Sequence, residues 1–140
     1  MSKQYLGFLL LILLTSCNTA VEPADLPLLN GYWEIKEVRF KDGTKKEYSV
    51  NSTVDYITLD SLKGFRKKVN PKFNGSFETS NDAEAFTIKI KNDSLFMEYK
   101  NDLTHWQEAL LTVSQDFFSV KNEEGVIYHY QRFEPINITP

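Results

Sequence analysis

The chain has 140 residues, of which 25% are charged and 14% are aromatic, and its formal net charge is −3. This composition supplies enough apolar side chains for a hydrophobic core and excludes a disordered protein. The mild acidity argues against nucleic acid as a partner, because neutralising phosphates requires a basic surface.

Residues 1–16 have the pattern of a secretory signal peptide. Lys3 precedes an apolar run from Tyr5 to Leu14 that is too short to span a bilayer as a mature helix. The sequence Leu-Thr-Ser-Cys that ends at Cys17 resembles a bacterial lipobox, and Cys17 is the single cysteine of the chain. We therefore expect acylation of Cys17 and anchoring in the bacterial cell envelope, at the outer membrane. The alternative is an ordinary signal peptide with a cysteine at its cleavage site.

The mature chain is long enough for one domain. Removal of residues 1–16 from the 140-residue chain leaves 124 residues. Residues 18–30 contain two prolines and show no periodicity, so the segment 17–30 is expected to be the lipidated cysteine followed by an extended linker. The domain is expected over residues 31–134, and residues 135–140 form a tail.

Residues 31–134 have the pattern of antiparallel β-structure. Runs rich in Phe, Tyr, Ile and Val alternate with turn signals such as Asp42-Gly43 and Asn74-Gly75, many of them about 8–12 residues apart. The clearest strand covers residues 85–91, where apolar and polar residues alternate. Further strands are expected over residues 95–100, 105–114, 117–121 and 126–133. The pattern predicts an all-β sandwich or barrel.

The first strand contains an irregularity. Trp33 and Ile35 lie on one face of a regular strand, whereas Val38 and Phe40 lie on the other. A strand buried on one side needs an extra residue to change faces in this way, which predicts a bulge or bend near Lys36. Such a bend allows the sheet to close into a barrel without exposed edges.

Gly31-Tyr32-Trp33 at the start of the first strand, together with Arg132 in the last, resembles the lipocalin signature. The sequences around these positions also resemble short lipocalin-like lipoproteins of Bacteroidota. The resemblance implies an antiparallel up-and-down barrel of roughly eight to ten short strands. It also implies that Trp33 closes one end of the barrel and that Arg132 lies across the indole, a cation–π contact. Because the sequence continues for seven residues after Phe133, we expect no counterpart of the C-terminal helix of secreted lipocalins.

The interior of such a barrel has two interpretations. Its apolar side chains line a cavity for a small hydrophobic molecule, or they pack together and fill the barrel. The leading hypothesis is a non-enzymatic binder or carrier of a small hydrophobic molecule in the cell envelope. The alternative is a filled barrel that acts as a protein- or glycan-interaction module. The candidate cavity-lining residues are Ile35, Phe86, Ile88, Ile90, Leu95, Met97 and Tyr99.

Signatures of catalysis are absent from the sequence. It has no Gly-x-Ser-x-Gly elbow, no His-Glu-x-x-His pair and no glycine-rich phosphate loop. His105 and His129 are the two histidines of the chain, and neither is accompanied by a cluster of metal-ligating residues. We therefore predict no enzyme, no cofactor and no metal site.

One segment is strongly basic. Five cations fall between residues 63 and 72, and no acidic residue lies between Asp60 and Glu78. One interpretation is a basic surface that binds phosphorylated lipid headgroups or acidic glycans. The alternative, which we prefer, is an edge strand protected from pairing by its lysines. The five residues are Lys63, Arg66, Lys67, Lys68 and Lys72.

Overall fold

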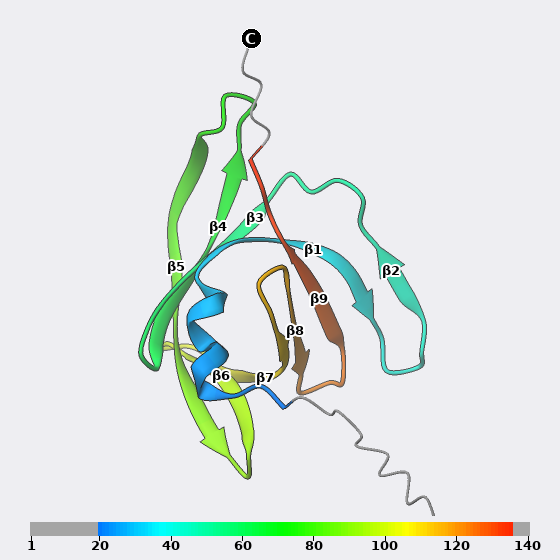
Figure 1. The fold of residues 1–140 in the computed structure, drawn as a ribbon, viewed down its shortest axis with the longest axis vertical. Helices are drawn as coiled ribbons and strands as arrows, with labels where there is room; N and C mark the ends of the chain where they lie inside the picture. The colour runs from blue at the N-terminus through cyan, green and yellow to red at the C-terminus, as the bar shows by residue number, and fades with distance from the viewer. Residues whose placement is uncertain (1–19, 136–140) are drawn as a thin grey trace, which may run out of the picture.

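The computed structural model describes residues 20–135 (Figure 1). The predicted signal peptide and Cys17 lie outside the described residues. No helix in the described part of the chain is long and apolar enough to cross a membrane. The described elements are the 3-10 helix η1 (Pro23–Leu29) and the strands β1 (Gly31–Arg39), β2 (Lys45–Glu47), β3 (Val54–Asp60), β4 (Lys63–Pro71), β5 (Phe77–Lys91), β6 (Ser94–Lys100), β7 (His105–Val113), β8 (Phe117–Asn122) and β9 (Ile127–Arg132).

The strands form one antiparallel sheet that closes on itself. Strands β3 to β9 follow one another in chain order, and β1 pairs with β3 on one side and with β9 on the other. The result is an eight-stranded up-and-down barrel of β1 and β3 to β9, with β2 added to the far end of β1. Closure satisfies the backbone groups that an open sheet leaves at its edges. The structure confirms the predicted all-β antiparallel barrel.

Strand β1 contains the irregularity that its sequence predicts. The pairing of β1 with β9 shifts by one residue at Lys36. Before the shift Ile35 lies opposite Tyr130, and after it Val38 lies opposite Tyr128. The extra residue therefore directs Ile35 and Val38 to the same side of the barrel wall, which a regular strand with this sequence cannot do.

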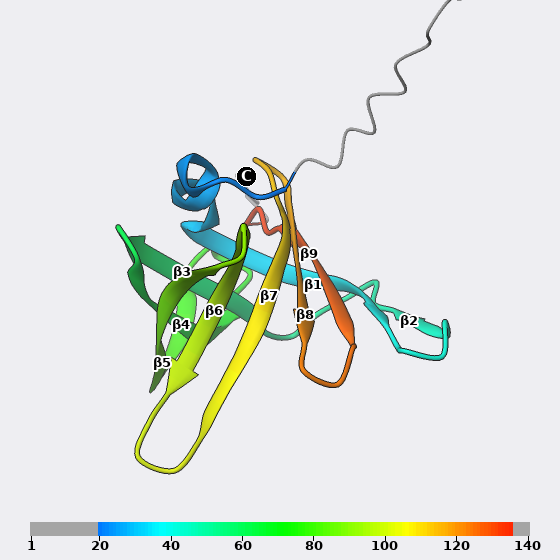
Figure 2. The same cartoon turned by 90° about the horizontal axis from the view of Figure 1, so that it is seen from below.

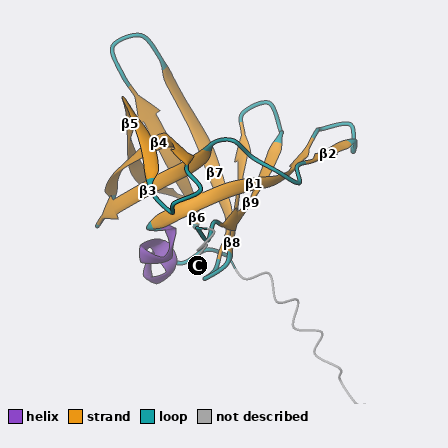
Figure 3. Cartoon of the chain, turned by 90° about the horizontal axis from the view of Figure 1, so that it is seen from above, coloured by secondary structure: helices purple, strands orange, loops and turns teal. Residues whose placement is uncertain are grey.

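The barrel has two different ends (Figures 2 and 3). At the closed end, η1 lies across the start of β1 and contacts β3 and β7, and the β3–β4, β5–β6 and β7–β8 turns reach the same end. At the open end lie the β6–β7 and β8–β9 turns, with no helix over them in the described part of the chain.

The prediction of an extended linker over residues 18–30 is wrong for the part of this segment that covers the closed end. Within that segment, Pro23–Leu29 forms η1, which begins with a proline and has a capping box at its N-terminus. Leu26 and Leu29 are three residues apart, so they lie on one face of a 3-10 helix. Both are buried in the barrel core, and their burial stabilises a helix that is too short to be stable alone.

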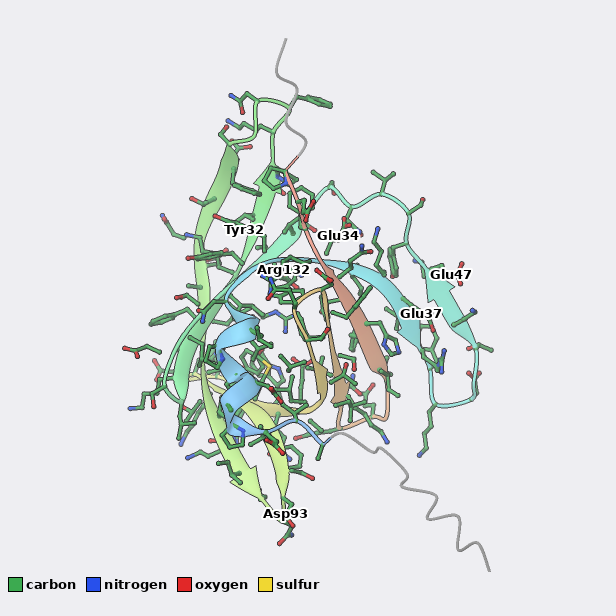
Figure 4. All side chains as sticks on the ribbon, in the orientation of Figure 1. Tyr32, Glu34, Glu37, Glu47, Asp93 and Arg132 are labelled. Carbon is green, nitrogen blue, oxygen red and sulfur yellow. The ribbon has the colours of Figure 1, made fainter. Side chains whose placement is uncertain are left out.

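Trp33 and Arg132 meet at the closed end. Trp33 is fully buried, and its Nε1 donates a hydrogen bond to the carbonyl oxygen of Leu29 (2.8 Å). The Arg132 guanidinium lies 4.1 Å from the centre of the indole ring. Figure 4 labels Arg132 close to β1 and η1. Because the guanidinium contacts the indole of β1 and also donates hydrogen bonds to nearby carbonyls, it connects η1, β1 and the β7–β8 turn. Arg132 donates to the carbonyl oxygens of Leu28 (2.7 Å), Asn30 (2.9 Å) and Gln115 (2.6 Å).

Gly31 makes this contact possible. Its φ of +130° lies in a region that side chains rarely adopt. A Cβ atom at this position would also collide with Nη1 of Arg132. The glycine of the Gly-x-Trp motif therefore gives the arginine room to reach the tryptophan two residues later.

The half of the interior next to the closed end is filled. Phe118 packs edge-on against Trp33, with ring centroids 4.7 Å apart, and stacks on Tyr130 at 4.5 Å. These spacings leave no room for another molecule between the rings. The buried apolar residues of this core include Leu26, Leu29, Ile57, Phe86, Ile88, Leu95, Met97, Leu110 and Val120.

Candidate functional site

A cluster of charged side chains occupies the interior on the open-end side of this core. It is centred on Arg66 of β4, whose side chain is 11% exposed. The Arg66 guanidinium donates hydrogen bonds to the Asp55 carboxylate (2.8 Å) and to the hydroxyls of Tyr99 (3.1 Å) and Tyr130 (2.6 Å). It also lies 3.5 Å from the carboxylate of Glu108. Four strands, β3, β6, β7 and β9, thus contact one arginine that reaches across from β4.

Asp55 is the most deeply buried charged group of the cluster, at 3% exposure. Burial alone would raise the pKa of Asp55, but the charges of Arg66 and Lys68 hold it below its usual value. One carboxylate oxygen accepts from Arg66. The other lies 2.6 Å from Nζ of Lys68, an ion pair without hydrogen-bond alignment. Asp55 is therefore ionised at neutral pH and depends on two cations.

The other members titrate at higher pH than usual. Burial raises the pKa of Glu108 and raises the pKa of Tyr99 to about 12, and it also raises the pKa of Tyr130. Burial alone would lower the pKa of Arg66, but the two tyrosines and the carboxylates around it raise that pKa well above its usual value. At neutral pH the tyrosines are neutral, and the arginine is charged.

Aromatic and aliphatic side chains lie between Arg66 and the open end of the barrel. Trp106 stacks on Tyr99 with ring centroids 4.9 Å apart and lies opposite it in the sheet. Ile35 and Tyr128 pack against the core from the same interior side and, like Trp106, are half-buried. These three half-buried side chains lie at inward positions between Arg66 and the open end. We use the name mouth cup for the set of inward side chains around Arg66, which consists of Ile35, Asp55, Arg66, Lys68, Glu84, Tyr99, Trp106, Glu108, Tyr128 and Tyr130.

Glu84 gives the mouth cup an unpaired acid. It lies opposite Arg66 in the β4–β5 register and is exposed, and its side chain forms no hydrogen bond or ion pair with the described residues. It lines a hollow of about 180 Å³ together with Asp55, Arg66, Lys67, Lys68 and Asp82. Arg66 and Lys68 already pair with Asp55. The cup therefore offers a free negative charge to a ligand.

The structure places the predicted cavity-lining residues in three environments. Ile35 belongs to the mouth cup. Ile90 is 56% exposed near the β5–β6 turn, and its assignment to the interior is corrected, because the strand runs past the packed core at this position. The remaining five, Phe86, Ile88, Leu95, Met97 and Tyr99, are at most 3% exposed within the core, and the Tyr99 hydroxyl also reaches Arg66 in the mouth cup.

The predicted basic surface is divided by the alternation of β4. Arg66 and Lys68 contact Asp55 on the inner side. Lys63 and Lys67 occupy positions of the opposite parity, which direct them to the outer face, and Lys72 follows the end of β4. The run of cations in the sequence therefore does not form one basic surface, and its buried member, Arg66, is the centre of the site. The preferred interpretation of an edge strand is also wrong, because β4 pairs with β3 on one side and with β5 on the other.

The histidines remain apart from this site. His105 lies 3.7 Å from Glu98, and His129 lies opposite Glu37 in β1. Among the described residues, no group of three or more His, Cys, Asp or Glu side chains is placed to hold a metal ion.

A second concave surface lies outside the barrel. Tyr32 stacks on Phe77 at 4.3 Å, and Phe77 lies 6.1 Å from Phe133. Next to these rings is a groove of about 510 Å³, formed by Glu34, residues 49–52, residues 71–73, Gly75, Phe77 and residues 133–135. We call it the outer groove. It could not be predicted from the sequence, because its residues come from four separate segments of the chain.

The fold and the closed end define the class as a lipocalin-like β-barrel. No family model matches the sequence, and neither does any curated protein. A solved lipocalin-like protein from Bacteroides uniformis ATCC 8492 is 13% identical, with 76% of this chain and 99% of that chain covered and a TM-score of 0.47. An uncharacterized protein from Bacteroides eggerthii DSM 20697 is 14% identical, with 75% and 99% covered and a TM-score of 0.47. These similarities concern the fold alone.

Proposed function

We propose that this protein is a non-enzymatic binding protein of the bacterial cell envelope. In this proposal Cys17 carries the lipid anchor at the outer membrane, and the mouth cup holds a small amphipathic molecule. The observation that carries the proposal is the charged cluster around Arg66 in the middle of the barrel. A buried ion pair contributes little net stability, and apolar side chains of similar volume fill such a space equally well or better. We therefore assign the charges to binding.

The chemistry of the cup suggests the kind of ligand. Trp106 and Tyr128 offer aromatic surface to an apolar or flat body. Glu84 offers a carboxylate to an ammonium or another hydrogen-bond donor. Because the apolar core between Arg66 and the closed end is packed, we expect the ligand to lie between Arg66 and the open end. This position makes an amphipathic molecule a better fit than a purely hydrophobic one.

Three probes with the same ring and different heads test this proposal. They are 2-phenylethylamine, 2-phenylethanol and 3-phenylpropionate, and binding is followed by the indole N–H signal of Trp106 in nuclear magnetic resonance spectra of the mature chain. We expect the amine to bind best. Glu84→Gln is expected to weaken its binding by about 3- to 10-fold, the range of a partly exposed charge contact. Glu123→Gln, an exposed acid in the β8–β9 turn, is the matched control and is expected to leave binding unchanged.

Two results would contradict the proposal. If none of the probes binds and native mass spectra of protein purified gently from cells show no adduct, the mouth cup is not a ligand site. If 3-phenylpropionate binds best, the role given to Glu84 is wrong. The anchor is tested separately, since Cys17→Ser is expected to release the protein from the membrane fraction.

The outer groove supports a second candidate, a filled barrel that binds an envelope protein or glycan. Phe73 and Val50 beside the groove are 85% and 87% exposed, and exposed apolar side chains around a concave surface are typical of interaction sites. Crosslinking in intact cells from a photoreactive residue at Phe73, compared with one at Leu103 in the β6–β7 turn, tests this candidate. A partner captured at both positions or at neither argues against it.

A further inference from the structure

The closed end of the barrel carries a ring of exposed apolar side chains. Each of the three hairpins that reach this end contributes at least one of them: β3–β4, β5–β6 and β7–β8. Their exposed fractions run from 37% to 56%. We call this set the apolar ring, and its members are Leu62, Phe65, Ile90, Leu111 and Phe117.

The outer face of η1 continues the apolar ring. Three residues of η1 are exposed, namely Pro23, Ala24 and Pro27, and two more, Asp25 and Leu28, are half-buried. The Asp25 carboxylate accepts a hydrogen bond from the backbone N–H of Glu22 at the start of the helix. The helix therefore presents a mainly uncharged surface away from the barrel.

The chain enters the barrel at this same end. Val21 is buried, and Ala20 and Val21 line a hollow with Leu111 and with residues 93–95 at the β5–β6 turn. Figure 2 shows the first described residues beside η1. Cys17 is three residues before Ala20, and three residues span at most about 10–11 Å even when fully extended. An acylated Cys17 must therefore lie within about 11 Å of the closed end.

We infer that the closed end of the barrel rests on the lipid bilayer through the apolar ring, with the mouth cup directed away from the membrane. This inference rests on the proposed anchor at Cys17. The tether is too short for the barrel to turn over, because β6 alone, which runs from the closed to the open end, spans about 20 Å. Large exposed apolar side chains beside an acyl anchor gain free energy by entering the interfacial region of the bilayer.

Charge does not produce this orientation. The ends of the three hairpins carry Asp60, Asp93 and Asp116 beside Lys63 and Lys91. The acids outnumber the lysines, so anionic headgroups do not attract this surface. Contact with the bilayer through the apolar ring is therefore expected to change little with salt concentration.

Two reporters at the ends of β8 test the inference in the full chain, processed and acylated in bacteria. Gln115→Cys lies in the β7–β8 turn at the closed end, and Glu123→Cys lies in the β8–β9 turn at the open end; both positions are exposed. Because Cys17 is the single native cysteine and its thiol is acylated, each new thiol is labelled alone with nitrobenzoxadiazole. The vesicles contain phosphatidylethanolamine, phosphatidylglycerol and a spin-labelled lipid that quenches fluorescence within the bilayer.

We expect quenching of the label at position 115 and little quenching at position 123. The double variant Phe65→Ser/Phe117→Ser is expected to reduce quenching at position 115, whereas Phe73→Ser/Leu103→Ser, with both changes away from the closed end, is the matched control. If the protein floats with the vesicles but both labels are quenched equally, or position 123 more strongly, the orientation is wrong and the anchor stands. If the protein does not float, the anchor is wrong and the orientation falls with it.

Discussion

Removal of the Arg66 guanidinium is expected to destabilise the barrel strongly. Arg66→Met keeps much of the side-chain volume but leaves the Asp55 carboxylate, 3% exposed, without its hydrogen-bonded cation. Loss of one partner from a buried ion pair costs about 3–5 kcal/mol. The hydroxyls of Tyr99 and Tyr130 lose the same partner. For a domain that unfolds with a urea slope of about 2 kcal/mol per M, the midpoint falls by about 2 M.

The double variant Arg66→Met/Asp55→Leu separates the lost pair from a general defect in packing. Because it removes the orphaned charge as well, it is expected to recover at least half of the loss. Lys68, the other partner of Asp55, is 67% exposed and can return to solvent at little cost.

The pH dependence gives an independent test of the same reasoning. In the wild type the pKa of Asp55 is lowered on folding, so this group stabilises the fold above its unfolded pKa of about 3.9, and the contribution is lost as the pH falls through the lower folded value. Without Arg66, burial raises the folded pKa, and the ionised carboxylate then destabilises the protein as the pH rises. The deficit of Arg66→Met is therefore expected to be smaller at about pH 5 than at about pH 8. A deficit below about 1 kcal/mol at both values would refute the role given to Arg66.

Three further substitutions test the site and the closed end. Glu108 has a raised pKa, so it costs stability as the pH rises above its unfolded value; Glu108→Gln is expected to gain stability relative to the wild type between pH 4 and pH 8 in urea titrations, and a constant difference would contradict this. Arg132→Lys keeps the charge but loses the fork that donates to three carbonyls, which is expected to cost about 2–3 kcal/mol and to weaken hydrogen-exchange protection of η1 first; unchanged protection there would argue against the closure. Gly64→Ala places a Cβ against the Thr58 carbonyl oxygen and 2.6 Å from Cζ of Phe86, so a melting temperature lower by several degrees is expected, and a stabilised variant would contradict the packing.

The barrel and its irregular first strand could be predicted because local patterns encode them. Alternation over residues 85–91 identifies a half-buried strand, and the change of face between Ile35 and Val38 requires an extra residue in β1. The pattern does not predict that β5 begins at Phe77, because residues 77–84 are mostly polar. The pattern does not predict the helix η1 either, since two leucines three residues apart give a weak signal beside two prolines.

The mouth cup could not be predicted, because its residues break the rule that identifies inward positions. Alternation assigns a face to each side chain of a strand, but the choice of the inner face depends on which set is apolar. Arg66 and Asp55 lie on the inner face although they are charged, so the pattern assigns them to solvent. Arg66 and Asp55 meet Glu108 and the two tyrosines only through the pairing of five strands. A local sequence pattern does not encode such pairings. Polar residues at inner positions are therefore the places where the sequence pattern fails and a functional site is expected.

The arginines toward the two ends of the barrel have different kinds of hydrogen-bond partner. This contrast supports a structural role for Arg132 and a binding role for Arg66. At the closed end, Arg132 satisfies the carbonyls of η1 and covers Trp33, so the charge completes hydrogen bonds that the fold itself requires. At the open end, Arg66 satisfies no backbone group in the described residues; its partners are side chains that are themselves costly to bury. Apolar residues at these positions would fill the same space without that cost. The charges around Arg66 are therefore best explained by contacts with a molecule at the mouth, whereas those around Arg132 are explained by the barrel.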